Sequence, residues 1–415
     1  MPDGLKAGAP GVLQRTMELP DGSIRYEWET RHPIAYYLIS MAIADYEEYT
    51  IDITLPDQPE FPLVNYIYDN PEVMTDLKTE IDATVPMMEL FADLFGPYPF
   101  ADEKYGHAMA PMGGGMEHQT MSTMQTFTFG LNAHELAHQW FGDYVTCGSW
   151  SDIWINEGFA RYGEYLAAEF LIGRSSADTW MRSLQDYVKG NPSGSIYIPE
   201  DEADDPGRIF DFRLTYNKGG AILHTLRYLI NDDEAYFEAL RSYAEKFSND
   251  VATGADFRDS MEDDTGIELG DFFNEWYYGS GYPIYDITWE HRNDSLVVYA
   301  VQETSDPASI SLFTTPMPLE AILNGTDTLL RLTPSANEQT FRVFLPGEVS
   351  SLSFDPDSYL IKTVNSIRNG SVTSAEPLEN AGIRLFPNPA DNYIHINLPA
   401  GHPRIMLTDL QGRIL

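Results

Sequence analysis

Two histidines and a glutamate lie close together in the segment His-Glu-Leu-Ala-His at 134–138. Histidines four residues apart share one face of a helix, so the imidazoles of His134 and His138 can both point at one ion. Glu135 is turned aside from both and can reach a water molecule at that ion as a general base. Eighteen residues separate His138 from Glu157. Two histidines and a glutamate, with a fourth position open, form the ligand set of a catalytic zinc, so we expect one Zn²⁺ per chain.

The short pattern does not establish a site alone, because three fixed positions also occur by chance in long chains. Its context favours a site: the first segment has an apolar body, and Gly142 can end its helix. A second helix predicted over 152–166 would return Glu157 to the first. Glu164, seven residues after Glu157, lies close to the same face and can orient a ligand histidine. The alternative for Glu164 is a solvated helix carboxylate.

These segments resemble the zinc aminopeptidases related to aminopeptidase N and leukotriene A-four hydrolase. The matching stretches are His-Glu-Leu-Ala-His-Gln-Trp-Phe-Gly at 134–142, Trp-Ile-Asn-Glu-Gly-Phe-Ala at 154–160, Gly-Gly-Met-Glu-His at 114–118 and Tyr-Asn-Lys-Gly at 216–219. They occur in the family order and cover the middle of the chain. His118 departs from the family, which usually has Asn there, so we assign it no binding role.

The resemblance implies roles for further residues. Glu117 would bind the free α-ammonium of a substrate, and Gly114, Gly115 and Met116 would bring the backbone close to that substrate. Tyr216 would donate its hydroxyl proton to the oxyanion of the tetrahedral intermediate. From the residues alone the glycines also fit a flexible loop, and a tyrosine at the start of a helix usually serves packing.

Composition restricts the partners of the protein. The 415 residues include 64 acidic and 25 basic side chains, a formal charge of −39. This charge argues against nucleic acid or an anionic membrane surface as a partner and mildly favours basic or neutral substrates. The single Cys147 excludes an intrachain disulfide, and no apolar run is long enough to span a bilayer.

The expected fold is a multidomain α+β protein whose thermolysin-like zinc peptidase domain occupies residues 55–281. Residues 1–54 contain two alternating stretches, 23–29 and 35–43, which predict strands. In the family a large β domain precedes the catalytic domain. Since 1–54 is too short for it, this segment resembles the C-terminal remnant of that domain.

Within the catalytic domain the patterns predict strands at 61–68 and 104–110 and one helix over 71–95. The region 165–281 is expected to be mainly helical. An acidic stretch at 200–206 interrupts it and is predicted to be a solvated loop.

The remaining chain changes character after residue 281. Alternating segments over 282–365 predict a small β-sandwich, and residues 366–381 are rich in linker residues. Residues 382–415 resemble the start of the C-terminal sorting domain of proteins exported by the type IX system of Bacteroidetes; the alternative is an unrelated immunoglobulin-like hairpin. We therefore expect a secreted or cell-surface protein that interacts with the sorting machinery, although the chain shows no signal-peptide pattern.

Three functions are compatible with these observations. The first is an aminopeptidase acting on peptides with a free N-terminus. The second is a thermolysin-type zinc endopeptidase, which would need no ammonium-binding Glu117. The third is a non-catalytic secreted binding protein on a zinc peptidase fold. The intact ligand set with Glu135 and Tyr216 argues against the third, and Met116-Glu117 argues against the second.

Overall fold

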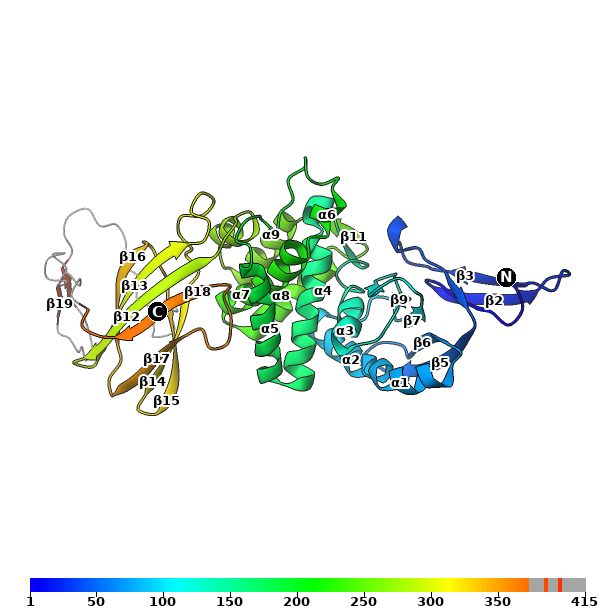
Figure 1. Cartoon of the computed structure of the whole chain (residues 1–415), viewed down its shortest axis with the longest axis horizontal. Helices are drawn as coiled ribbons and strands as arrows, with labels where there is room; N and C mark the ends of the chain where they lie inside the picture. The colour runs from blue at the N-terminus through cyan, green and yellow to red at the C-terminus, as the bar shows by residue number, and fades with distance from the viewer. Residues whose placement is uncertain (373–383, 387–394, 398–415) are drawn as a thin grey trace. The chain divides into compact units, whose positions relative to one another are not determined.

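The computed structural model describes residues 1–372, 384–386 and 395–397, which form two compact units (Figure 1). The first unit comprises Met1–Ser280 together with Ser358–Ile361. The second comprises Gly281–Asp357 and the described residues from Lys362 onward. In the described part of the chain, no helix is both long and apolar enough to cross a membrane.

The first unit begins with two antiparallel strand pairs, β1 with β4 and β2 with β3. Their bounds are β1 Lys6–Gly8, β2 Val12–Glu18, β3 Ile24–Glu29 and β4 Ala42–Ala44. The strand predicted at 23–29 is confirmed as β3. The strand predicted at 35–43 is wrong, because a 3₁₀ turn (η1, Tyr36–Leu38) occupies much of it and β4 begins only at Ala42. A continuous apolar run does not distinguish a strand from a helical turn.

A five-stranded sheet with the order β5-β6-β7-β9-β8 carries one wall of the site. Its strands are β5 Tyr46–Ile53, β6 Phe61–Tyr68, β7 Tyr105–Met109, β8 Gly115–Met116 and β9 Ser122–Met124. The strands predicted at 61–68 and 104–110 are confirmed as β6 and β7. The two-residue strand β8 lies at the edge of the sheet and pairs antiparallel with β9. Glu117 follows it directly.

The single helix predicted over 71–95 is wrong, because the chain forms two helices there. Helix α1 covers Pro71–Asp82. The residue before it, Asn70, caps the helix, because its side chain accepts a hydrogen bond from the Glu72 amide. Helix α2 covers Thr84–Phe95. Pro86 accounts for the break: it has no amide hydrogen to donate, and its ring conflicts with the carbonyl four residues earlier, at the last residue of α1.

Helices α3 (Phe129–Ala137) and α4 (Trp154–Ala167) carry the predicted metal ligands. Helix α3 ends at Ala137, earlier than the predicted stop at Gly142, but the His138 amide still donates to the His134 carbonyl. The two helices approach closely where Gly163 of α4 faces Ala137; a Cβ at Gly163 would lie only 2.7 Å from the Ala137 Cβ. The two helices thus pack closely, and Glu157, in the first turn of α4, lies beside the two histidines.

The rest of the first unit is mainly helical, as predicted for 165–281. Its elements are η2 Trp150–Asp152, η3 Ala168–Ile172, α5 Arg174–Lys189, α6 Pro206–Ile209, η4 Phe212–Lys218, α7 Gly219–Ile230, α8 Asp233–Lys246, α9 Gly254–Thr265, α10 Gly270–Phe272 and η5 Phe273–Tyr277. Strands β10 (Val145–Cys147) and β11 (Asp250–Ala252) pair in parallel. The acidic stretch 200–206 contains no regular element before α6.

The second unit consists of two sheets, with the strand orders β16-β13-β12-β18 and β15-β14-β17. Its strands are β12 Pro283–Arg292, β13 Ser295–Thr304, β14 Met317–Leu323, β15 Thr326–Leu332, β16 Glu338–Phe344, β17 Val349–Phe354 and β18 Thr363–Asn369. The rings of Tyr285 on β12 and Phe354 on β17 lie 4.8 Å apart, so the sheets contact each other as expected for a sandwich.

Strand β18 includes residues 366–369, which the sequence assigned to a linker. Its polar side chains explain the error, because Asn365 and Ser366 donate hydrogen bonds to Asp286 of the neighbouring strand. Beyond it, the short strands β19 (Arg384–Phe386) and β20 (His395–Asn397) pair antiparallel. Residues 373–381 of the predicted linker, and the rest of the predicted sorting domain at 382–415, lie outside the described residues.

Candidate active site

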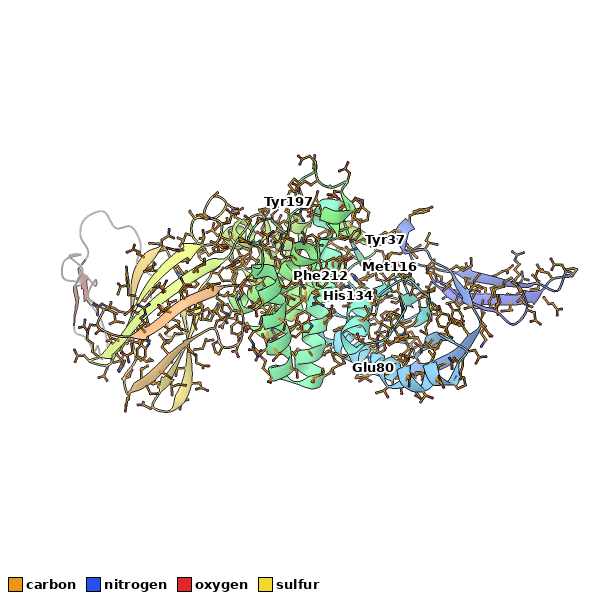
Figure 2. All side chains as sticks on the ribbon, viewed as in Figure 1. Tyr37, Glu80, Met116, His134, Tyr197 and Phe212 are labelled. Atoms are coloured by element: carbon orange, nitrogen blue, oxygen red, sulfur yellow. The ribbon has the colours of Figure 1, made fainter. Side chains whose placement is uncertain are left out.

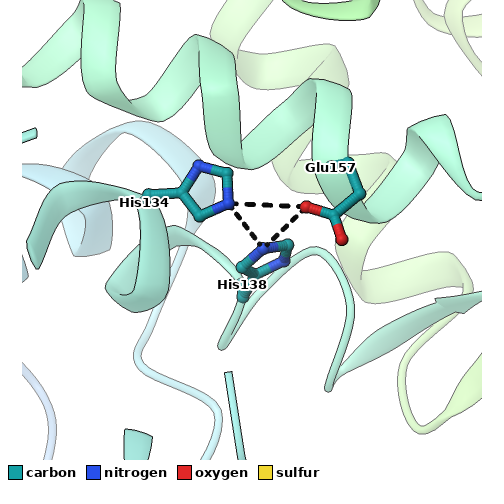
Figure 3. Close-up of side chains that lie close together, drawn as sticks. All are labelled: His134, His138 and Glu157. Atoms are coloured by element: carbon teal, nitrogen blue, oxygen red, sulfur yellow. Dashed lines mark hydrogen bonds and ion pairs between the residues drawn. The ribbon is translucent and has the colours of Figure 1, made fainter. Parts of the chain in front are cut away.

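Helices α3 and α4 bring the three predicted metal ligands to one point (Figure 3). The Nε2 atoms of His134 and His138 lie 3.1 Å apart, and they lie 3.4 and 3.3 Å, respectively, from Oε2 of Glu157. Ligand atoms of a tetrahedral zinc with bonds of about 2.0–2.2 Å are about 3.3–3.6 Å apart. The three side chains therefore fit a zinc ion with almost no rearrangement.

The other nitrogen of each histidine has an oxygen partner. Nδ1 of His134 lies 2.9 Å from Oε1 of Glu164, and Nδ1 of His138 lies 3.0 Å from the Phe141 carbonyl oxygen. An Nδ1–H that donates to an oxygen leaves Nε2 unprotonated and available to a metal. Glu164 thus lies where the sequence analysis expected it. The Phe141 carbonyl could not be found from the sequence, because any residue type supplies that oxygen.

Charge also favours a cation at this point. Burial raises the pKa of Glu157, but the contacts of its carboxylate with the imidazoles of His134 and His138 outweigh burial and lower that pKa to about 2. Glu157 is therefore an anion at neutral pH. A buried anion beside two imidazoles is a suitable site for a divalent cation.

Glu135 lies beside the three ligands without joining them. Its side chain is buried, and its Oε2 atom has no hydrogen-bond partner among the described residues. Burial, the largest effect, raises the pKa of Glu135 to about 8. A carboxyl group with a raised pKa and an unpartnered oxygen is suited to accept and return a proton during a reaction.

Strand β8 encloses Glu135 from the other side. A Cβ at Gly115 would overlap the Glu135 carboxylate, so any larger residue there would displace that carboxylate. Gly113 and Gly114 before it have φ of +80° and +79°, a backbone conformation that favours glycine. Gly113 and Gly114 thus form a bend that leads into β8.

We expect Gly115→Ala to displace the Glu135 carboxylate and lower kcat by about 100-fold, the cost of misplacing a catalytic group by about 1 Å. Zinc content, measured by atomic emission, should not change, because the ligands lie on α3 and α4. Gly270→Ala is the matched control, since nothing lies within 4 Å of the added carbon. Unchanged turnover in Gly115→Ala would show that Gly115 does not define the position of Glu135.

Glu117 lies next to this group. One carboxylate oxygen of Glu117 falls within 4.8 Å of a Glu135 oxygen and of a His138 nitrogen. Burial is the main cause of its raised pKa. His118, by contrast, is not among the cavity-lining residues, and its Nδ1 lies 2.8 Å from Thr123 Oγ1. This position agrees with assigning His118 no binding role.

Tyr216 reaches the same point from η4. Its ring lies 6.1 Å from that of His134, and the two planes differ by 13°. Burial and then the charge of Glu157 raise the pKa of Tyr216. The phenol therefore remains protonated at neutral pH and can donate a hydrogen bond to an oxyanion.

These residues line one cavity of about 740 Å³. Tyr37, Met116, His134 and Phe212, which are labelled in Figure 2, are four of the residues that line it. Its lining residues are Tyr37, Gly113, Gly114, Gly115, Met116, Glu117, Thr128, Gly130, Leu131, His134, Glu135, His138, Trp150, Ile153, Glu157, Arg161, Glu164, Phe210, Phe212 and Tyr216. Every site residue predicted from the sequence is among them.

The cavity also contains residues that the sequence analysis missed. Tyr37, from the N-terminal part of the chain, accepts a hydrogen bond from Asn156 Nδ2 at 2.9 Å. Arg161 and the aromatic rings of Trp150, Phe210 and Phe212 were also missed. The Ala-Tyr-Tyr-Leu run around Tyr37 is the local signal for it, but that run predicts a strand and no place in a cavity.

Comparison with known proteins agrees with this geometry. Residues 79–276 match the peptidase family M1 domain. That segment contains all the site residues predicted from the sequence, and the match supports the resemblance to zinc aminopeptidases. Tyr37 lies outside it.

Individual relatives are aminopeptidases as well. The chain is 24% identical to human endoplasmic reticulum aminopeptidase 1 over 395 residues, which cover 83% of this chain and 40% of that protein. It is 34% identical to aminopeptidase N of Lactobacillus delbrueckii subsp. lactis over 164 residues (36% and 18%). It is 30% identical to aminopeptidase N of Lactococcus lactis subsp. lactis over 179 residues (40% and 20%). The chain thus spans less than half the length of these relatives.

Proposed function

We propose that this chain contains the catalytic part of a zinc-dependent aminopeptidase that removes N-terminal residues from peptides. The observation that carries the proposal is the position of Glu117, a buried carboxylate within 4.8 Å of both Glu135 and His138 ligand atoms. An endopeptidase has no need of a second carboxylate there. The M1 match and the relatives that are named aminopeptidases support the same activity.

Each side chain has a defined part in the reaction. Zinc held by His134, His138 and Glu157 would act as a Lewis acid that polarises the peptide carbonyl and activates a water molecule. Glu135 accepts the proton of the attacking water and passes it to the leaving amine. The Tyr216 phenol donates a hydrogen bond to the developing oxyanion.

Glu117 gives the reaction its preference for a chain end. A carboxylate paired with the substrate's α-ammonium fixes the distance from the N-terminus to the reacting carbonyl. Glu117 is already buried, so an α-ammonium that pairs with it compensates the burial of its carboxylate. A peptide with a blocked N-terminus would leave Glu117 buried without a cationic partner.

The intact site argues against the non-catalytic alternative. A binding protein on this fold has no reason to preserve Glu135 with an unpartnered oxygen beside an intact ligand set. Hydrolysis of aminoacyl chromophores tests the proposal: a chelator should abolish the activity and stoichiometric Zn²⁺ should restore it. Full activity in metal-free protein would contradict it.

For the C-terminal segment we propose a type IX sorting function and therefore a secreted or cell-surface location. The support is the sequence resemblance of residues 382–415, centred on Leu-Phe-Pro-Asn-Pro-Ala-Asp-Asn at 385–392. The partner would be the sorting machinery of an exporting cell.

Deleting residues 382–415 is expected to abolish export in a host with a type IX system and to leave peptide hydrolysis unchanged, because every predicted site residue lies in the first unit. Activity in the culture medium and in cell extracts measures both effects. A deletion within the acidic stretch, 201–204, is the control for a general loss of export. Export that continues without the segment would refute the sorting proposal.

A further inference from the structure

Arg161 has no part in the reaction described above, yet it occupies a wall of the active-site cavity. It lies on α4, one turn after the ligand Glu157. Together with Phe212 it also borders a second cavity of about 380 Å³. Among the described residues that line the active-site cavity, Arg161 is the one with a permanent positive charge.

The contacts of Arg161 lead to the metal site. Its Nη1 donates to Oε2 of Glu164 at 2.6 Å, and the other oxygen of that carboxylate lies 2.9 Å from Nδ1 of His134. Each oxygen of Glu164 thus has its own partner. The chain of hydrogen bonds runs from Arg161 through Glu164 to a metal ligand.

Arg161 is itself held in one orientation. Its Nε donates to Oδ1 of the buried Asn217 at 2.9 Å. Its guanidinium lies 4.6 Å from the centre of the Trp180 ring and 5.2 Å from that of Phe212. A planar guanidinium with directed hydrogen bonds and ring contacts is a rigid support, which a flexible ammonium does not reproduce.

Glu164 needs such a support because its carboxylate is buried in an acidic cavity. The Glu157 carboxylate lines the same space, and its negative charge repels that of Glu164. In the described part of the chain, Arg161 is the residue that holds the second oxygen of Glu164 against that repulsion; without it, the carboxylate could rotate away from His134. His134 would then lose the acceptor that keeps Nε2 directed at the metal.

We propose that Arg161 is a positioning residue that holds Glu164 against His134 and thereby strengthens zinc binding. The inference rests on the zinc site of the proposed function. It assigns Arg161 no contact with substrate or with the reacting atoms.

The test is zinc affinity, measured with Zn²⁺ alone by competition against a chromogenic chelator. Arg161→Met should weaken zinc binding by about 10- to 100-fold, which is the usual effect of losing the hydrogen bonds that orient a metal ligand. Arg161→Lys should recover part of the loss, since it restores a charge without the fork of donors. Arg258→Met is the matched control, because Arg258 pairs with Asp259 away from the cavity.

A double-variant cycle separates this role from general destabilisation. In a Glu164→Gln background, Arg161→Met should change zinc affinity by less than about threefold, because the pair acts as a unit. The melting temperature of metal-free Arg161→Met should stay near that of metal-free wild type. If Arg161→Met does not fold, Arg161→Lys alone should still bind zinc more weakly than wild type.

Some outcomes would overturn the inference while the proposed function stands. The first is a zinc affinity equal to that of wild type in Arg161→Met or, if that variant does not fold, in Arg161→Lys. The second is a loss of zinc affinity on Arg161→Met that is the same in the wild-type and the Glu164→Gln backgrounds. A wild-type protein that binds no zinc would contradict the proposed function itself.

Discussion

Glu135→Gln is expected to keep its zinc and lose about 10²- to 10⁴-fold in kcat, the contribution of a positioned general base. Glutamine has the size of glutamate, so it fits beneath β8 at Gly115, but its amide cannot accept the proton of an attacking water. Glu135 does not belong to the His134, His138 and Glu157 triangle, so the metal should remain.

Steady-state kinetics and zinc content by atomic emission measure the two effects. Glu200→Gln, an exposed side chain in the acidic stretch, is the matched control and should behave as wild type. If Glu135→Gln loses its metal together with its activity, Glu135 is a ligand and the assigned roles are wrong. Retained turnover would exclude it as the general base.

Glu117→Ala is expected to lower kcat/KM on substrates with a free amino group by roughly 30-fold to several thousandfold. The estimate corresponds to about 2–5 kcal/mol for removing one partner of a buried charge pair. Glu117→Gln should show most of the loss, since the interaction depends on charge. Zinc content should stay constant in both variants.

Substrate blocking provides the internal control for Glu117. N-acetylated substrates have no ammonium, so they should be poor for wild type and little changed by Glu117→Ala. An equal loss on free and acetylated substrates would mean that Glu117 supports the site in general. His118→Ala should affect free-amine substrates much less, because His118 contacts Thr123 instead of the cavity.

The three predicted metal ligands could be found from the sequence because the signals for them are local. The four-residue spacing of His134 and His138 places them on one helix face, and the segment with Glu157 forms a second helix. The residue types themselves carry the chemistry. Two details followed from tertiary contacts instead: the Phe141 carbonyl that orients His138 and the close approach of Gly163 to Ala137.

The cavity residues that were not predicted from the sequence lack such local signals. Tyr37 is brought to the cavity from far along the chain, and no spacing links it to Asn156. In the sequence, nothing distinguishes Arg161 from an ordinary arginine on the surface of a helix. Its role is visible only when Asn217 and Trp180, from other elements, are seen to hold it.

The incorrect predictions of secondary structure have different physical causes. The break between α1 and α2 could be predicted from the sequence, since Pro86 cannot continue a helix. The apolar spacing alone predicts one continuous helix and hides that break. The turn at Tyr36–Leu38 was not readable from an apolar run. Strand β18 was missed because its polar residues Asn365 and Ser366 satisfy Asp286 of the neighbouring strand.

In the proposed function, hydrolysis requires zinc, and Glu117 selects substrates by binding their free N-terminal ammonium group. The most direct test compares wild-type hydrolysis of one short peptide with its N-acetylated form, each with chelator and with restored Zn²⁺. We predict that the free peptide is shortened from its N-terminus only when zinc is present, and that the acetylated peptide is cleaved at least about 30-fold more slowly. Equal cleavage of both peptides would contradict the aminopeptidase proposal and favour a zinc endopeptidase.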